Sequence, residues 1–108
     1  MTLSNLYKLI QKRKKEMPTN SYTADLFRAG PDRIIQKFGE ESVEAIIAAK
    51  NGNKKEIISE IADTWFNMLI LLVYFNISIK NIENELAKRR YTKAGKSKST
   101  NDTILTYD

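Results

Sequence analysis

Two pairs of acidic residues have the types and spacing that metal-assisted chemistry needs. Glu41 and Glu44 form one pair and Glu60 and Asp63 form the other, with the members of each pair three positions apart. Residues three apart lie on the same face of an α-helix, so each pair would present two carboxylates together. The connection at residues 51–53 (Asn-Gly-Asn) is short, which makes the flanking helices antiparallel neighbours. We therefore expect the four carboxylates to converge.

Both pairs lie where an acid is unusual. A helical wheel of residues 31–50 has an apolar stripe made of Ile34, Phe38, Ala45 and Ala49, with Ala48 and Ser42 at its edges. Glu41 falls in the middle of this stripe and Glu44 borders it. Residues 54–75 are apolar around most of the helix, which predicts burial on most sides. The narrow polar sector of that helix consists of Glu60, Asp63 and Asn67.

Four carboxylates held close together would have strongly raised pKa values unless a cation lay between them. Oxygen ligands without histidine or cysteine select a hard ion, Mg²⁺ or Mn²⁺, and Mg²⁺ commonly shares its coordination with substrate phosphates. This donor set indicates hydrolysis of a phosphoanhydride, in which the ion neutralises phosphate charge and orients or acidifies a water. The alternative is that basic residues neutralise the acids in structural ion pairs. The candidates for that role are Arg33, Lys37 and Lys54.

The composition narrows the chemistry further. The chain has 108 residues with neither cysteine nor histidine. The absence of cysteine excludes a disulfide framework, a thiolate zinc site and a thiol nucleophile. The absence of histidine excludes imidazole ligands and Ser-His triads. Catalysis must therefore use carboxylates, lysines, hydroxyls or a hard cation.

The net charge of +5 comes from one short stretch of the chain. Six basic residues and no acid lie between Lys88 and Lys98, and without them the chain would have a net charge of −1. Nucleic-acid-binding proteins usually distribute lysine and arginine over a folded face. We interpret the stretch as a solvated basic tail. A helical dimerisation or nucleic-acid-binding module that uses residues 88–98 is the non-enzymatic alternative.

The pattern of apolar residues, proline, glycine and capping residues predicts an all-α protein. We expect helices at residues 3–16, 31–50, 54–75 and 79–90, with one turn at 23–28 inside a connector. The helical bundle would have a central antiparallel helix pair and would be completed by dimerisation, since one chain is too small to cover the apolar helix 54–75. The domain would span residues 1–91, and residues 92–108 would be a polar C-terminal tail.

The sequence gives no sign of targeting or membrane insertion. The N-terminus lacks the apolar core of a signal peptide. The longest unbroken apolar run, Met68 to Phe75, is far shorter than the roughly 20 residues needed to span a bilayer. We expect a cytoplasmic protein without a membrane partner.

Several motifs in one order resemble phosphoribosyl-ATP pyrophosphohydrolases. They are the SYTADL element at residues 21–26, Gly30, Arg33, KFGEESVE at residues 37–44, and EIAD at residues 60–63 before a long apolar helix. The resemblance covers about residues 3–90. The wider superfamily contains the all-α, Mg²⁺-dependent nucleotide pyrophosphohydrolases, including MazG-like and dimeric dUTPase-type enzymes.

This resemblance implies the second step of histidine biosynthesis, in which phosphoribosyl-ATP is hydrolysed to phosphoribosyl-AMP and pyrophosphate by a homodimer. It implies metal ligation by Glu41, Glu44, Glu60 and Asp63. It implies a catalytic role for Glu41 and, as an outer ligand or water-positioning base, for Glu40. It implies substrate contacts by Arg13, Ser21, Tyr22, Thr23, Arg33 and Lys37, and Asn67 is a further candidate for substrate binding.

The chain departs from the family pattern after Asp63. A leucine-rich stretch followed by Tyr-His is typical there, whereas this chain has Thr64, Trp65, Phe66 and Asn67. Asn67 can replace the hydrogen bonding of a histidine but not its proton transfer. The departure leaves room for an alternative activity, that of a house-cleaning nucleoside triphosphate pyrophosphatase of the MazG-like or dUTPase-type class.

Overall fold

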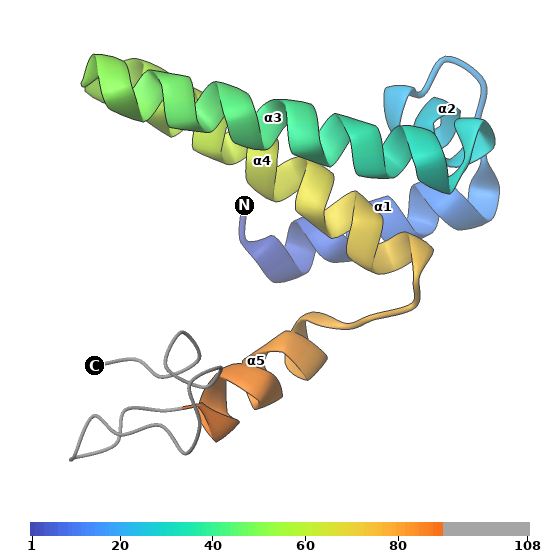
Figure 1. The fold of residues 1–108 in the computed structure, drawn as a ribbon. Coiled ribbons are helices and arrows are strands. Elements are labelled where there is room, and N and C mark those ends of the chain that lie inside the picture. The colour runs from blue at the N-terminus through green and yellow to red at the C-terminus, as the bar shows by residue number, and fades with distance from the viewer. Residues whose placement is uncertain (90–108) are drawn as a thin grey trace. The chain divides into compact units, whose positions relative to one another are not determined.

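The computed structural model describes residues 1–89, and within them it contains five α-helices and no strand (Figure 1). The predicted all-α class is confirmed. The predicted tail, residues 92–108, and the predicted domain boundary at residue 91 lie outside the described residues. The helices are α1 (Leu3–Glu16), α2 (Tyr22–Ala29), α3 (Pro31–Asn51), α4 (Lys54–Tyr74) and α5 (Ile79–Lys88).

Side-chain caps fix where the helices begin. The Thr2 hydroxyl accepts a hydrogen bond from the backbone N–H of Asn5 at 3.0 Å, at the start of α1. Ser21 caps α2 in the same way, accepting from the N–H of Ala24 at 3.1 Å. Each cap satisfies a backbone donor that has no partner inside the helix. With this cap, residues 22–29 form a two-turn helix rather than the single turn predicted at 23–28.

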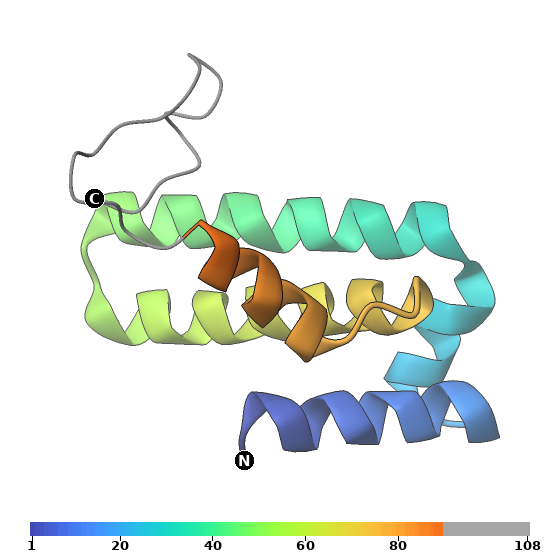
Figure 2. The same cartoon turned by 90° about the horizontal axis from the view of Figure 1, so that it is seen from below.

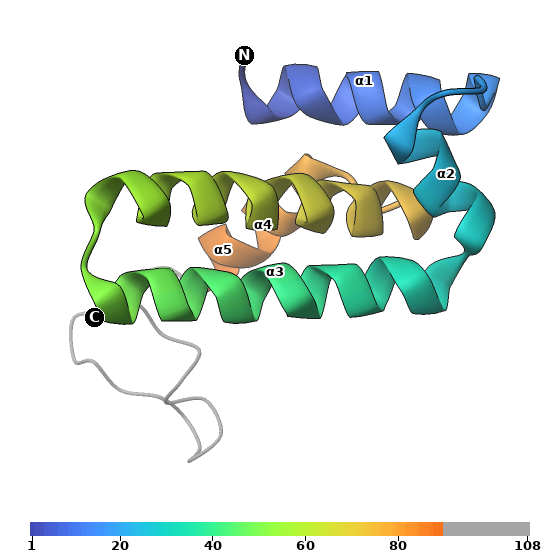
Figure 3. The same ribbon diagram turned by 90° about the horizontal axis from the view of Figure 1, so that it is seen from above.

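The helices α3 and α4 form an antiparallel pair joined by a very short connection. Gly52 ends α3 with a φ of 73°, a left-handed conformation that favours glycine, and Asn53 caps α4. Helix α4 lies between α3 and α1, and α2 joins α1 to α3 at the end where α4 finishes (Figures 2 and 3). The acid-bearing segments of α3 and α4 are thereby held side by side.

The core lies where the C-terminal half of α4 meets α1 and α3. Its fully buried side chains are Ile10, Ile34, Leu69 and Ile70. On α3 the buried alanines are Ala45 and Ala48, whereas Ala49 is exposed. The predicted stripe is therefore rotated slightly, because a wheel at 100° per residue does not show where the neighbouring helix crosses.

The two halves of α4 differ in burial. Leu69, Ile70 and Val73 are at most 3% exposed, whereas Ile58 is 63% exposed and Trp65 is 48% exposed. The prediction that α4 is buried on most sides is therefore wrong for the N-terminal half within a single chain. That half has α3 on one side and no other described helix of residues 1–77 covering it.

Helix α4 is long and apolar enough to span a membrane, and no other helix in the described residues is. The same properties are typical of the core helix of a soluble protein. Its end is tied to α1 by polar contacts, since the Tyr7 hydroxyl donates to the Ile77 carbonyl at 2.7 Å and Lys14 Nζ donates to the Val73 carbonyl at 3.3 Å. These contacts support the core-helix interpretation.

Helix α5 belongs to a separate unit that begins at Ser78. Ser78 and Asn81 form a reciprocal capping box at its start. The helix is amphipathic, and its apolar side includes Ile82 and Leu86, both of which are exposed.

Candidate metal and substrate site

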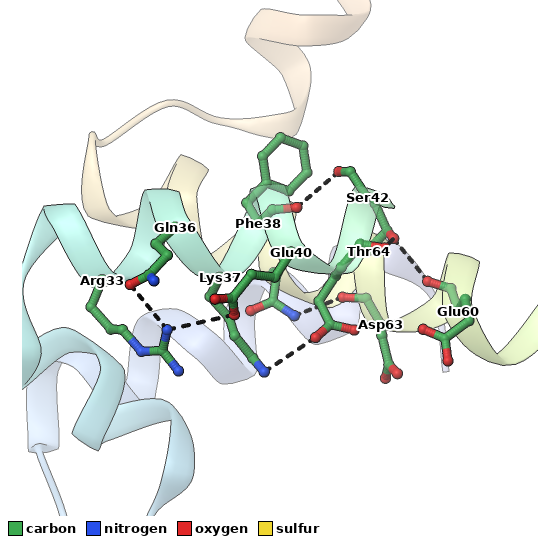
Figure 4. A network of polar contacts seen from close by, with 11 residues as sticks. Arg33, Gln36, Lys37, Phe38, Glu40, Ser42, Glu60, Asp63 and Thr64 are labelled. Atoms are coloured by element: carbon green, nitrogen blue, oxygen red, sulfur yellow. Dashed lines mark hydrogen bonds and ion pairs between the residues drawn. The ribbon is translucent and has the colours of Figure 1, made fainter. Parts of the chain in front are cut away.

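Three of the four predicted ligands lie together where α3 and α4 run side by side. Glu41 of α3 and Glu60 and Asp63 of α4 each offer a carboxylate oxygen, and the three oxygens lie within 4.8 Å of one another. Glu41 and Glu60 are partly buried and Asp63 is exposed. Figure 4 shows Glu60 and Asp63 projecting from α4 on the same side of the helix pair. A donor set of three carboxylates at this spacing fits a hard divalent cation.

The fourth predicted ligand, Glu44, is exposed and lies outside this group of three. It nevertheless contributes to the electrostatics of the cluster. Burial raises the pKa of Glu60 first, and the negative charges of Glu44, Asp63 and Glu41 raise that pKa further. The cluster therefore carries more negative charge than its surroundings stabilise, and a bound cation would relieve this.

Two basic residues of α3 pair with acids beside the cluster. Lys37 Nζ lies 3.1 Å from a carboxylate oxygen of Glu41, and this hydrogen bond raises the pKa of Lys37. Arg33 lies 3.6 Å from the carboxylate of Glu40, with both side chains well exposed. The ion pairs of the structural alternative thus exist for Lys37 and Arg33, but Lys54 forms none with a described residue.

No basic residue in the described part of the chain pairs with Glu60 or Asp63. Structural ion pairs therefore account for Glu41 but not for Glu60 or Asp63.

Thr64 joins the two helices at the level of the cluster. Its hydroxyl lies 2.8 Å from the carbonyl of Glu60, one turn earlier on α4, and 3.1 Å from the carbonyl of Glu41 on α3 (Figure 4). Both carbonyls belong to residues whose side chains are in the cluster. In the sequence, Thr64 stands out only as one of the residues that depart from the expected pattern after Asp63. Its position next to Asp63, as a polar residue on a mostly apolar helix, could have indicated that it lies near the acids.

A pocket of about 250 Å³ adjoins the acids. Its lining consists of Tyr22, Lys37, Glu41, Asp63, Phe66 and Asn67. Three residues predicted to contact substrate therefore lie in one place, namely Tyr22, Lys37 and Asn67. Tyr22 reaches the pocket because the Ser21 cap starts α2 there. Phe66 was not predicted to line the site, because an aromatic residue on an apolar helix is usually a core residue.

The other predicted substrate residues do not line this pocket. Ser21 uses its hydroxyl to cap α2, and Thr23 is partly buried next to it. Arg33 lies one turn from Lys37 and pairs with Glu40. Arg13 is in the last turn of α1, where its side chain forms no hydrogen bond or ion pair with a described residue. These four remain predictions.

Comparisons with known proteins indicate one family. The family model for phosphoribosyl-ATP pyrophosphohydrolase matches residues 3–90. A protein of Leptospira biflexa named phosphoribosyl-ATP pyrophosphatase is 55% identical over 87 residues, covering 81% of this chain and 95% of that protein. Proteins with the same name from Clostridium acetobutylicum and Listeria welshimeri are 48% and 42% identical. These two alignments cover 81% and 93% of this chain, and 79% and 92% of the relatives.

Proposed function

The chain belongs to the phosphoribosyl-ATP pyrophosphohydrolase family, and from that premise we propose how it works. It hydrolyses phosphoribosyl-ATP to phosphoribosyl-AMP and pyrophosphate, in histidine biosynthesis, and depends on a divalent cation held by Glu41, Glu60 and Asp63. The observation that carries the proposal is the approach of these three carboxylates to within 4.8 Å beside a pocket. Glu44, one turn from Glu41, completes the negative field and is the fourth candidate ligand.

Mg²⁺ is the expected cation and Mn²⁺ the substitute, and when bound it supplies charge for the phosphates and acidity for a water. The residues of the chain would do the rest. Hydrolysis adds water across the bond between the α and β phosphates, so one proton must leave the attacking water. In this proposal Glu40 and Glu41 would orient that water and accept its proton.

Lys37 and Arg33 would stabilise negative charge on the phosphates. Each lies beside an acid of the same helix, Lys37 beside Glu41 and Arg33 beside Glu40. Both acids are those that the proposal assigns to cation and water. When they turn to those partners, the two basic groups become available to substrate oxygens. Tyr22 and Asn67 would contact the rest of the substrate in the pocket, and Ser21, Thr23 and Arg13 are its further candidate contacts.

A second copy of the chain would cover the exposed apolar surface in the N-terminal half of α4. A groove on α4 is formed by Ile57, Ile58, Ile61, Ala62 and Trp65. Ile58, Ile61 and Trp65 of this groove are exposed, and an exposed apolar groove is typical of a subunit interface. On a helical wheel the groove lies on the face of α4 opposite Glu60 and Asp63, so a partner bound there would cover the other side of the helix that carries these acids. We propose a cytoplasmic homodimer with two such sites.

Release of pyrophosphate tests the activity. Purified protein is incubated with phosphoribosyl-ATP, ATP, dCTP or dUTP, each with Mg²⁺ and with a chelator. The proposal expects release that depends on Mg²⁺ and strongly prefers phosphoribosyl-ATP. Equal release from the simple triphosphates would favour a broad nucleotide pyrophosphatase that uses the same carboxylates. No release from any of them would mean that the acids are structural.

A further inference from the structure

Asn67 is the one polar side chain that is buried in the described residues, at 4% exposure. It lies on α4, one turn after Asp63, and lines the pocket beside the acid cluster. Its Nδ2 donates a hydrogen bond to the Asp63 carbonyl at 2.8 Å. That contact fixes which end of the amide faces the helix and which end faces away.

The oxygen of this amide opens on the pocket. No donor among the described residues forms a hydrogen bond with Asn67 Oδ1. Every fully buried side-chain nitrogen or oxygen in the described residues does have a partner. Asn67 Oδ1 must therefore be accessible, and the pocket is the space that Asn67 lines. A largely buried polar side chain whose acceptor has no partner in the protein is unfavourable unless a ligand or a water donates a hydrogen bond to that acceptor.

The surroundings of Asn67 indicate what that ligand is. Tyr22 and Phe66 contribute aromatic rings to the lining, which suit the flat, weakly polar surface of a nucleoside. Asn67 lies one helical turn, about 6 Å along the axis, from Asp63 of the carboxylate cluster. A group bound at Asn67 is thus beside the phosphates that the cluster would hold, not among them.

We propose that Asn67 Oδ1 accepts a hydrogen bond from an N–H or O–H group of the nucleoside part of the substrate and so determines which nucleotides bind. The inference rests on the proposed function, because it places the phosphates at the carboxylate cluster. It adds the chemical requirement that the nucleoside carry a donor at this point. The donor is either the amino nitrogen of the base or a ribose hydroxyl.

The variant Asn67→Leu removes the acceptor with little change in shape. The bond lost inside the protein goes to a carbonyl within α4, so the helix does not depend on it. The matched control is Asn51→Leu, the same exchange at the exposed end of α3, outside the pocket. Circular dichroism and thermal melts check that both variants fold.

The first readout is hydrolysis of phosphoribosyl-ATP with saturating Mg²⁺. We expect Asn67→Leu to raise KM about tenfold, because a donor on the substrate loses its partner. The Mg²⁺ concentration for half-maximal activity should stay within twofold of the wild-type value. Asn51→Leu should match the wild type in both.

The second readout identifies the donor and separates recognition from structure. The α,β-methylene analogues of ATP, 2′-deoxy-ATP and purine riboside triphosphate are tested as competitive inhibitors. One of the last two analogues lacks the donor that Asn67 would recognise, and the wild type should bind that analogue about tenfold more weakly than the ATP analogue. Asn67→Leu should bind that analogue and the ATP analogue equally well. Loss at the deoxy analogue identifies the hydroxyl, and loss at the purine riboside identifies the amino group.

Equal weakening of all three analogues by Asn67→Leu would overturn the inference, since a merely structural residue would act in that way. Failure of all three analogues to compete would also overturn it. The proposed function is judged separately by the wild-type release of pyrophosphate. Release that is insensitive to Asn67→Leu leaves the function standing and removes the inference. If the analogues bind with the expected dependence on Asn67 but no substrate releases pyrophosphate, the inference stands and the proposed function is wrong.

Discussion

The two halves of α4 differ in charge, in burial and in role. The C-terminal half packs against α1 and α3 and contributes Leu69 and Ile70 to the core, where both side chains are fully buried. The N-terminal half carries Glu60 and Asp63, and its apolar residues, such as Ile58, are exposed. One half stabilises the chain, whereas the other carries the candidate ligands and the apolar groove that we propose a second copy covers. Mutations should therefore separate activity from stability along a single helix.

The largest expected effect is the loss of turnover on removing a charge from the cluster. Glu41→Gln and Asp63→Asn keep side-chain size but remove the carboxylate that would hold the cation. We expect kcat/KM for phosphoribosyl-ATP to fall at least about a hundredfold, while circular dichroism shows unchanged helix content. A matched loss of stability in the absence of metal would instead assign both acids to structural ion pairs.

The opposite result is expected in the C-terminal half. Leu69→Ala would leave a cavity in the core and should lower the free energy of unfolding by about 2–5 kcal/mol. Ile58→Ala, in the exposed half, should change it by no more than about 0.5 kcal/mol under conditions where the chain is monomeric. Urea denaturation of the two variants measures the contrast. Equal costs would mean that the exposed half is covered within one chain.

The third prediction concerns the apolar surface of the exposed half. Trp65→Asp places a charge in the groove and should weaken association of two copies by about thirtyfold or more. Sedimentation velocity over a concentration series measures this, with Tyr22→Ser as a control at a similarly exposed aromatic outside the groove. A wild-type chain that sediments as a monomer at all concentrations would contradict the proposed homodimer.

A smaller effect is expected at the contact that joins α4 to α3. Thr64→Val keeps the branched shape and removes the hydroxyl that lies close to the carbonyls of Glu41 and Glu60. We expect a loss of about 1 kcal/mol in stability and a several-fold higher Mg²⁺ requirement. Thr64→Ser should restore the Mg²⁺ requirement. A stability change without a shift in the Mg²⁺ requirement would make Thr64 a packing residue only.

The smallest effect is a dependence on pH in the metal-free protein. The pKa of Glu60 is raised in the folded chain, chiefly by burial and then by Glu44 and Asp63. The folded state therefore binds the proton of Glu60 more tightly than the unfolded state, and ionised Glu60 opposes folding. Glu60→Gln should raise the Tm in chelator at pH 7, and the gain should disappear near pH 4. A gain that persists at pH 4 would exclude this cause.

Much of the fold follows from local signals in the sequence. Pro31 at the start of α3 and Gly52 at its end set the bounds of that helix within one residue of the expected range. The convergence of Glu41, Glu60 and Asp63 followed from helical spacing and a short connection. These features depend on the backbone of a few neighbouring residues, and such features can be read from the chain itself.

What could not be predicted depends on what covers each surface. A helical wheel identifies α4 as apolar nearly all round but does not show that only its C-terminal half is covered by the same chain. The wheel also placed Ala49 on the apolar stripe and Ala48 at its edge, whereas Ala48 is the buried residue of the two. The burial of Asn67 and the approach of Thr64 to the Glu41 carbonyl arise from the crossing of two helices, which no local pattern specifies.

The short connection between α3 and α4 has a consequence for the order of folding. The three clustered acids lie within 23 positions of one another, and the contact that unites them closes the smallest loop between two long helices in the chain. Small loops close at low entropic cost, so this hairpin is the natural early step of folding. The clustered carboxylates therefore begin to repel one another early in folding, when this hairpin forms. A divalent cation present at that moment would speed folding, whereas one added afterwards would act only on the finished structure.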